Sequence, residues 1–393
     1  MIAARALLGV AGSTMVPSAM ALIGVLFTEP RAHARAITIW MCSFMGGAAP
    51  GPVAGGMLLE HFWWGSVFLM GVPVMGVLLL AGPRTLPERR DPAAGRLDLP
   101  SVTLSLAAVL PFVYGLKSLS RNGFDLLAVA AVLAGVACGV VFVVRQRRLR
   151  TPLLDLRLFG NRTFATALTM TVFAGLTGAN QLFVSMYLQS VAGLSPGGAG
   201  LWLLPSTVAM LVSMQLAPVL VRRVPASVAI TGGLVVSAAG FLLLTQVSGG
   251  GLGLLVAGLV VANLGLGPMA GLCAVLAMQS APPERAGSAG ALASTAGELG
   301  LATGVAFLGM IGTALYSAGV SVTGLPAGAA DLARESVTGA TSVAATLSPS
   351  AGARLVDSAF GAVTSSLHAS AAICAGLVLL AGVLTVFGLR ARR

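Results

Sequence analysis

The chain has 393 residues, of which 56% are hydrophobic and only 9% are charged, with a mean hydropathy of +0.94 and a formal net charge of +11. A soluble domain averages about 25% charged residues, so this composition cannot supply the polar surface of a soluble protein, and it also excludes a disordered chain. The sequence therefore predicts an all-α polytopic membrane protein, because the apolar runs are continuous rather than alternating.

Eleven stretches are long and apolar enough to cross a hydrocarbon core of about 30 Å, which needs about 20 helical residues. In chain order these predicted spans are 2–27, 36–59, 63–81, 99–119, 126–144, 163–190, 197–221, 227–247, 252–278, 288–317 and 360–389. The segment 318–359 before the last span is too long for a tight turn. Residues 331–345 within it are expected to form a short amphipathic helix in an ordered lid, with a floppy loop as the alternative.

Arginine placement sets the expected orientation, because cytoplasmic loops of membrane proteins collect basic residues. Only Arg121, Arg334 and Arg354 lie in one alternate set of gaps. The other set and the C-terminal tail hold Arg31, Arg35, Arg84, Arg89, Arg90, Arg96, Arg145, Arg147, Arg148, Arg150, Arg157, Arg162, Arg222, Arg223, Arg285, Arg390, Arg392 and Arg393. The C-terminus is therefore expected in the cytoplasm of a plasma (inner) membrane protein, with basic loops facing anionic lipid rather than nucleic acid.

An odd number of spans with a cytoplasmic C-terminus places residue 1 outside the cell, although the chain begins without a signal peptide or basic leader. We therefore expect an odd number of upstream spans to be absent from this sequence. The alternative is a native N-terminus on the outer side.

Neither cysteines nor histidines form a pattern that predicts a metal, a cofactor or a catalytic centre. The four cysteines each lie in a separate apolar run without metal-ligand spacing, as expected of small hydrophobic residues: Cys42, Cys138, Cys273 and Cys374. The histidines His33, His61 and His368 lie far apart in the sequence. No P-loop is present, so ATP-driven transport is not supported, and a membrane-embedded enzyme is a weak alternative.

The second predicted span contains a glycine and proline motif, Gly47-Ala-Ala-Pro-Gly51-Pro52-Val-Ala-Gly55-Gly56. Gly47, Gly51 and Gly55 recur every four residues, so one helix face allows a neighbouring backbone to approach closely, and Pro52 is expected to bend the helix. A generic small-residue packing face is the alternative. The string resembles the antiporter motif of the major facilitator superfamily, G-x-x-x-G-P-x-x-G-G, at every fixed position.

Three further segments extend the resemblance over almost the whole chain. Residues 5–12 resemble the fourth-helix motif R-x-x-Q-G, with Leu8 in place of Gln, and residues 58–64 and 154–159 resemble two of the family's inter-helix links. The chain is thereby similar to the fourteen-helix drug:proton antiporters, close to QacA-type exporters, and corresponds to their helices four to fourteen. The resemblance implies residues 1–82 as the rest of an N-terminal bundle, 83–162 as a link with two extra helices, and 163–393 as a C-terminal six-helix bundle.

Glu298 and Arg5 are the charged residues expected to act in proton coupling. Glu298 lies ten residues into its span, where an ionised carboxyl is costly, and Ser294 and Thr295 lie one turn earlier on the same face. A carboxyl that exchanges its proton across the membrane is what an antiporter requires, and a structural acid bonded to a neighbouring helix is the alternative. The resemblance gives Arg5 a part in proton transfer or in holding the bundle; snorkelling to the headgroups is the alternative.

The sixth predicted span carries a polar stripe that is expected to face protein or water rather than lipid. Its candidate cavity-lining residues are Phe173, Thr177, Asn180, Gln181 and Tyr187, with the two aromatic rings available to a cation. Hydrogen bonding between helices is the alternative for the polar members.

The resemblance implies a proton-coupled secondary exporter of lipophilic or cationic drugs or antiseptics, and we expect it to act as a monomer in the bilayer without a cofactor. The partners are then protons and a small-molecule substrate. An exporter of an endogenous metabolite or antibiotic is equally compatible with the sequence, and an inactive fragment of such a transporter is a further alternative.

Overall fold

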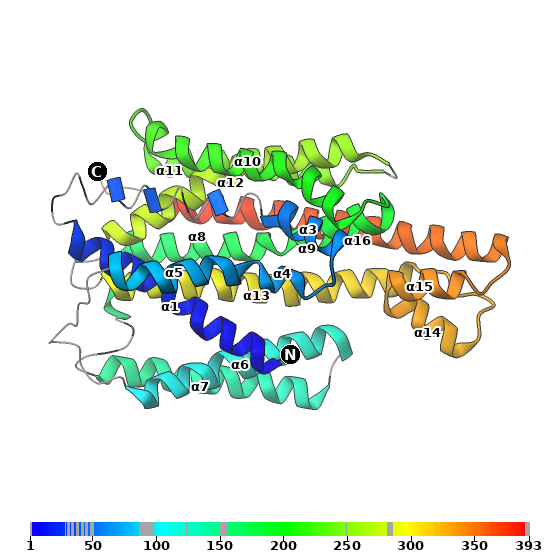
Figure 1. Ribbon diagram of the computed structural model, residues 1–393, viewed down its shortest axis with the longest axis horizontal. Coiled ribbons are helices and arrows are strands. Elements are labelled where there is room, and N and C mark those ends of the chain that lie inside the picture. The colour runs from blue at the N-terminus through cyan, green and yellow to red at the C-terminus, as the bar shows by residue number, and fades with distance from the viewer. Residues whose placement is uncertain are drawn as a thin grey trace.

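A computed structural model describes residues 2–27, 51–85, 98–122, 125–149, 156–248, 250–280 and 286–389, together with residues 29, 32, 35, 36, 39, 40, 43, 46, 47, 152 and 154. The described part of the chain is helical and contains no strand (Figure 1). Its helices are α1 (Ile2–Leu26), α3 (Gly51–His61), α4 (Ser66–Leu69), α5 (Gly71–Thr85), α6 (Leu99–Asn122), α7 (Leu126–Arg148), α8 (Arg162–Gly178), α9 (Asn180–Met186), α10 (Pro196–Leu220), α11 (Ala226–Leu244), α12 (Leu252–Gln279), α13 (Ala286–Gly319), α14 (Ala327–Glu335), α15 (Val337–Ala344) and α16 (Pro349–Gly388), with a 3₁₀ turn η1 (Leu156–Gly160) and a π-helical turn η2 (Tyr187–Val191).

The all-α membrane fold predicted from composition is confirmed. Among the described residues, nine helical stretches are long and apolar enough to cross a membrane, and they coincide with the last nine predicted spans. The first predicted span is helix α1. The second lies largely outside the described residues until Gly51, where α3 begins, so the bend expected at Pro52 is not tested.

Two of the predicted spans are interrupted rather than continuous helices. The third consists of α4 and α5, which meet at Met70, and the sixth consists of α8, α9 and the π-helical turn η2. A π-helical turn inserts one extra residue per turn and shifts the register of the side chains that follow it. From Tyr187 onward, the side-chain directions in this span therefore do not follow the periodicity of an α-helix.

The long helices run side by side, with α10, α11 and α12 along one edge, α8, α13 and α16 in the middle, and the pair α6–α7 along the other edge (Figure 1). Small residues allow this packing. A Cβ atom on Gly233 of α11 would lie 2.6 Å from the carbonyl oxygen of Gly265 on α12, and one on Gly267 would lie 2.5 Å from Cβ of Ser213 on α10. Close backbone approach of this kind is how membrane helices associate without a hydrophobic driving force.

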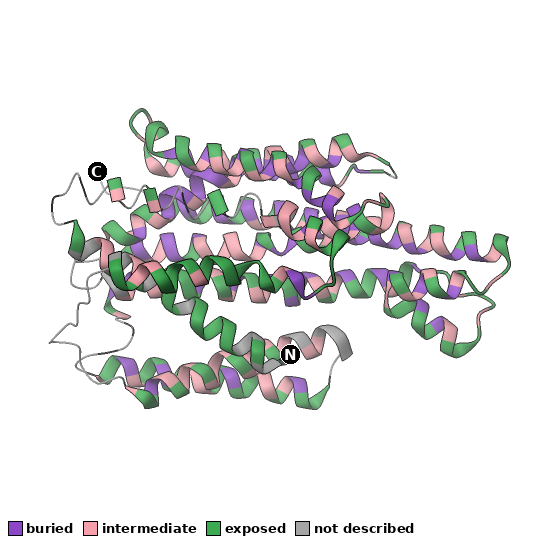
Figure 2. Ribbon diagram, in the orientation of Figure 1, coloured by how far each residue is buried: buried purple, intermediate pink, exposed green. Residues whose placement is uncertain are grey.

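Buried residues concentrate on α8 to α16, whereas α5 is exposed along its length (Figure 2). Leu79 and Leu80 of α5 are 76% and 72% exposed. An apolar exposed surface of this kind is stable next to lipid tails but not in water.

A polar cluster joins the two helices α6 and α7 at one end. Arg145 of α7 forms an ion pair with Asp98 just before α6, and the buried side chain of Gln146 donates to the hydroxyl of Ser101 at 2.7 Å. The amide oxygen of Gln146 also accepts from the backbone N–H of Leu154, 3.2 Å away. The α6–α7 pair is thereby tied to the segment that leads into η1 and α8.

The segment 318–359 is ordered and contains two short helices, α14 and α15, that form a hairpin against the ends of α13 and α16. Tyr316 donates its hydroxyl hydrogen to the carbonyl of Ala333, and the backbone N–H of Ser321 donates to the hydroxyl of Ser358. Ala333 and Ala340 are fully buried. The segment is therefore ordered, as in the predicted lid, and it contains two short helices where the sequence predicted one.

Candidate functional site

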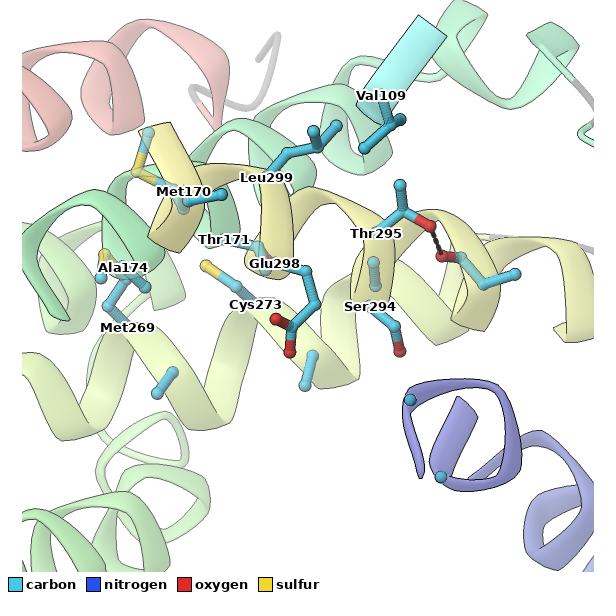
Figure 3. A pocket seen from close by; sticks show the side chains of 18 of the residues that line it. Val109, Met170, Thr171, Ala174, Met269, Cys273, Ser294, Thr295, Glu298 and Leu299 are labelled. Atoms are coloured by element: carbon cyan, nitrogen blue, oxygen red, sulfur yellow. Dashed lines mark hydrogen bonds between the residues drawn. The ribbon is translucent and has the colours of Figure 1, made fainter. Parts of the chain in front are cut away.

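A cavity of about 1070 Å³ lies beside the middle of α13, and the carboxylate of Glu298 points into it (Figure 3). Residues from α1, α6, α8, α10, α12 and α13 line the cavity. The volume is at the upper end of the range of about 300–1,000 Å³ that is typical of small-molecule sites. The cavity can therefore hold a drug-sized molecule in contact with Glu298.

Glycines on α13 decide where Glu298 points. A Cβ atom on Gly304 would lie 2.5 Å from the carbonyl oxygen of Leu176 on α8, and one on Gly300 would collide with the carbonyl of Val172. On the other side, a Cβ atom on Gly175 of α8 would lie 2.6 Å from the backbone nitrogen of Leu301. This face of α13 is filled by the α8 backbone, so Glu298, about a quarter turn away from Gly297, projects sideways into the cavity.

The wall around Glu298 is mainly apolar. Met170 and Ala174 of α8 and Met269 and Cys273 of α12 face the carboxylate across the cavity (Figure 3). Within the described residues, Glu298 is the one charged side chain that lines this cavity, and no hydrogen bond or ion pair reaches it from another described side chain. Glu298 is an exposed residue of this cavity, so its carboxylate is accessible to a cationic ligand that enters it.

The two hydroxyl residues expected near Glu298 differ in what they can do. Thr295 donates to the carbonyl oxygen of Ala291 on its own helix at 2.8 Å, so its hydrogen is already used. Ser294 lines the cavity on the same side as the carboxylate and is available to a ligand (Figure 3).

Arg5 lies in α1, one turn before Gly9, and both Gly9 and Gly12 line the cavity. The side chain of Arg5 is outside the described residues. Its role in proton coupling therefore stays a prediction.

The predicted antiporter motif contacts α10 through Gly56. A Cβ atom on Gly56 would lie 2.5 Å from the carbonyl oxygen of Pro196, whereas Cβ atoms on Gly47, Gly51 and Gly55 would have no described atom within 4 Å. The side chain of Pro52 is outside the described residues. Gly56, which makes this close contact, is not one of the three glycines that recur every four residues.

The polar stripe lies away from the Glu298 cavity. Asn180 is buried and accepts a hydrogen bond from Ser370 of α16 at 2.8 Å, and Tyr187 is buried and donates to the carbonyl of Ser248. Thr177 donates to carbonyls of its own helix, including that of Phe173, and Gln181 is exposed. These contacts are the interhelical bonding that was the alternative for Asn180, and cavity lining by this stripe stays a prediction.

Several cavity residues were not predicted from the sequence. They lie on other helices and carry no polar or periodic pattern of their own: Val109, Val113, Met170, Ala174, Met269 and Cys273. Glu298, an acid within a predicted span, was the sequence feature that pointed to this place. Within the described residues, no group of three or more His, Cys, Asp and Glu side chains could hold a metal ion.

Comparisons with known proteins agree on one family. Residues 1–305 match the family model of the Major Facilitator Superfamily. The multidrug efflux pump LfrA of Mycolicibacterium smegmatis is 40% identical over 100% of this chain and 78% of its own length, and the methyl viologen resistance protein SmvA of Salmonella typhimurium is 34% identical over 97% of this chain and 77% of its own length. A crystal structure of a bacterial homologue of the human lysosomal transporter Spinster, inward-facing and unoccupied, superimposes with a TM-score of 0.53 at 17% identity, covering 95% of this chain and 76% of that one.

Proposed function

The chain belongs to the Major Facilitator Superfamily of multi-pass membrane transporters, and we propose that it exports lipophilic cations across the plasma membrane in exchange for protons. The observation that carries the proposal is the carboxylate of Glu298 in a large apolar cavity, without a described partner. The names of the relatives support the substrate class, since one is a multidrug efflux pump and another confers resistance to methyl viologen, an organic cation.

In the proposed mechanism, Glu298 binds either a proton or the cation, but not both. When the cavity faces the outside, a proton binds to the carboxylate and displaces the cation, because the neutral acid no longer attracts a positive charge. When the cavity faces the cytoplasm, the proton leaves and the ionised carboxylate attracts the next cation. Each cycle then moves one proton inward and one cation outward.

The proposal includes the orientation predicted from arginine placement. Arg145, Arg147 and Arg148 lie in the last turn of α7, and the hairpin α14–α15 lies at the opposite end of the molecule from the chain's C-terminal end (Figure 1). The hairpin is then extracellular and the C-terminus cytoplasmic. A cysteine introduced at Ala327 should react with a membrane-impermeant maleimide added to intact cells, and a lack of labelling there with labelling after lysis would contradict the orientation.

The decisive experiment measures cation-driven proton movement in proteoliposomes that hold a pH-sensitive dye. Adding tetraphenylphosphonium should move protons through the unsubstituted protein, Glu298→Gln should abolish the signal, and Glu298→Asp should retain part of it. Glu60→Gln is the matched control, because Glu60 is an exposed carboxylate at the end of α3 and does not line the cavity. Unchanged proton movement in Glu298→Gln would overturn the proposal.

The same assay tests the expected correspondence with helices four to fourteen of a fourteen-helix transporter. The chain is compared with a fusion that carries three additional apolar helical spans before residue 1. Activity in the fusion alone would support the correspondence, and activity in the unextended chain alone would contradict it.

A further inference from the structure

A second cavity, of about 990 Å³, lies further along α13 toward the α14–α15 hairpin, and we call it the hairpin cavity. One part of its wall is apolar, with Leu182 of α9 and Val305 of α13 among its residues. Its other end is polar, with Thr313 and Ser317 of α13 and the charged residues Asp331, Arg334 and Glu335 of α14. A wall that is apolar at one end and charged at the other suits an amphipathic ligand.

The hairpin cavity adjoins the Glu298 cavity. Two residues, Val113 of α6 and Ala302 of α13, line both of them. Along α13 the wall positions follow one helical stripe that continues from one cavity into the other: Ala291, Thr295, Glu298, Ala302, Ala306, Gly309, Thr313 and Ser317. The two cavities are therefore successive parts of one path along α13, with Val113 and Ala302 at their junction.

Helix α6 contributes the other side of this junction. Val109 of α6 lines the Glu298 cavity and Val113, one turn later, lines both cavities (Figure 3 shows Val109 opposite Thr295 and Leu299). Ala302 adds only a methyl group from the α13 side. The junction is therefore lined by one branched and one small side chain, and a bulkier side chain at position 302 would fill part of it.

We propose that the hairpin cavity is a second binding site for the lipophilic cation of the proposed function, and that Val113 and Ala302 set the size of the cation that passes between the two sites. The apolar body of the cation packs against α6 and α13, and its charge lies toward Asp331. Each cavity is large enough for one drug-sized molecule, so a cation can occupy the second site after leaving Glu298. The inference rests on the proposed function for the identity of the ligand.

Binding in the hairpin cavity is tested without transport. In purified protein, tetraphenylphosphonium should slow maleimide modification of Thr313→Cys at least threefold, with labelling quantified at that position by peptide mass spectrometry so that native cysteines remain. Ala314→Cys is the matched control, because Ala314 is the exposed neighbour that lines neither cavity. Equal labelling rates of Thr313→Cys with and without the cation would overturn the second site, whether or not the protein transports.

The junction is tested by the size dependence of efflux. Ala302→Phe should lower export of tetraphenylphosphonium tenfold or more and export of the narrower methyl viologen less than twofold, whereas Ala314→Phe should change neither. Ala302→Gly should raise the relative export of the larger cation. An unchanged ratio of the two export rates in Ala302→Phe would overturn the role of the junction. A lack of export of both cations by the unsubstituted protein would count against the proposed function. In that case the labelling result would still decide whether the second site exists.

Discussion

One terminal nitrogen of Arg145 lies 2.9 Å from Oδ1 and 3.2 Å from Oδ2 of Asp98, and so joins the last turn of α7 to the start of α6. The same arginine donates through Nε to the hydroxyl of Ser101, which itself donates to Asp98 at 2.5 Å. Ser101 is fully buried and Gln146 is 2% exposed, so the cluster has a dry inner part and a partly exposed ion pair. The predictions below begin with these two parts.

Replacing Gln146 by Leu should destabilise the protein by about 1–3 kcal/mol, because it leaves the buried Ser101 hydroxyl and the N–H of Leu154 without this partner. Thermal unfolding of the detergent-solubilised protein measures the effect. Gln246→Leu is the control, because Gln246 is exposed and bonds only to the neighbouring Thr245 side chain. Equal midpoints for the two variants would contradict the structural role of Gln146.

The ion pair should make stability depend on pH only at low pH. The Ser101 hydroxyl, followed by the Arg145 guanidinium, lowers the pKa of Asp98 below its ordinary value of 3.8. A lowered carboxyl pKa stabilises the fold above the unfolded value, and this contribution disappears as pH falls through the folded pKa. The difference in unfolding midpoint between the unsubstituted protein and Asp98→Asn should therefore be constant from about pH 5 to 8 and shrink below about pH 4. A difference that grows toward low pH would have the wrong sign.

Replacing Gly304 by Ala should force α13 away from α8, since the new Cβ would lie 2.5 Å from a backbone oxygen that cannot rotate aside. Overpacking of this kind costs about 1–3 kcal/mol. Gly290→Ala on the same helix meets no atom closer than 4.0 Å and should be neutral or stabilising by up to about 1 kcal/mol. Unfolding midpoints of the two variants give the comparison, and a similar change in both would show that α8 and α13 pack less closely than described.

Replacing Asn180 by Leu separates the two interpretations of the polar stripe. As a hydrogen-bond acceptor from Ser370, Asn180 should contribute about 0.6–1.7 kcal/mol, and the substitution should lower stability while the relative export of different cations stays constant. Ser370→Ala should have a similar effect on stability. A change in cation preference at unchanged stability would instead support the cavity-lining interpretation.

The spans were predictable because lipid imposes a length and an apolar composition that can be read from the sequence directly. The outer part of α16 was not predictable as a helix, because residues 349–359 contain Arg354 and Asp357 and have the composition of a water-exposed loop. They are helical because α15 packs against them and buries Leu355 and Gly352. Tertiary contacts decided this segment, and the hydropathy of the segment alone does not contain them.

Glu298 could be singled out from the sequence because an acid within a span is rare. Its surroundings could not, because Met170 and Cys273 are ordinary apolar residues far from it along the chain. The Asp98–Arg145 pair was hidden for the same reason, since its members are separated by 47 positions and follow no periodic pattern.

The length of α16 has a mechanical consequence. Its 40 residues form one continuous helix of about 60 Å, roughly twice the thickness of the hydrocarbon core, and its far end adjoins the short helices beyond α13. Such a helix acts as a lever, so a tilt of about 10° around one end would carry the other end about 10 Å sideways. A small rotation of α16 within the bilayer would thus become a large displacement of its outer end near the α14–α15 hairpin. The distance between two fluorescent labels, one of them at that end, would measure this displacement.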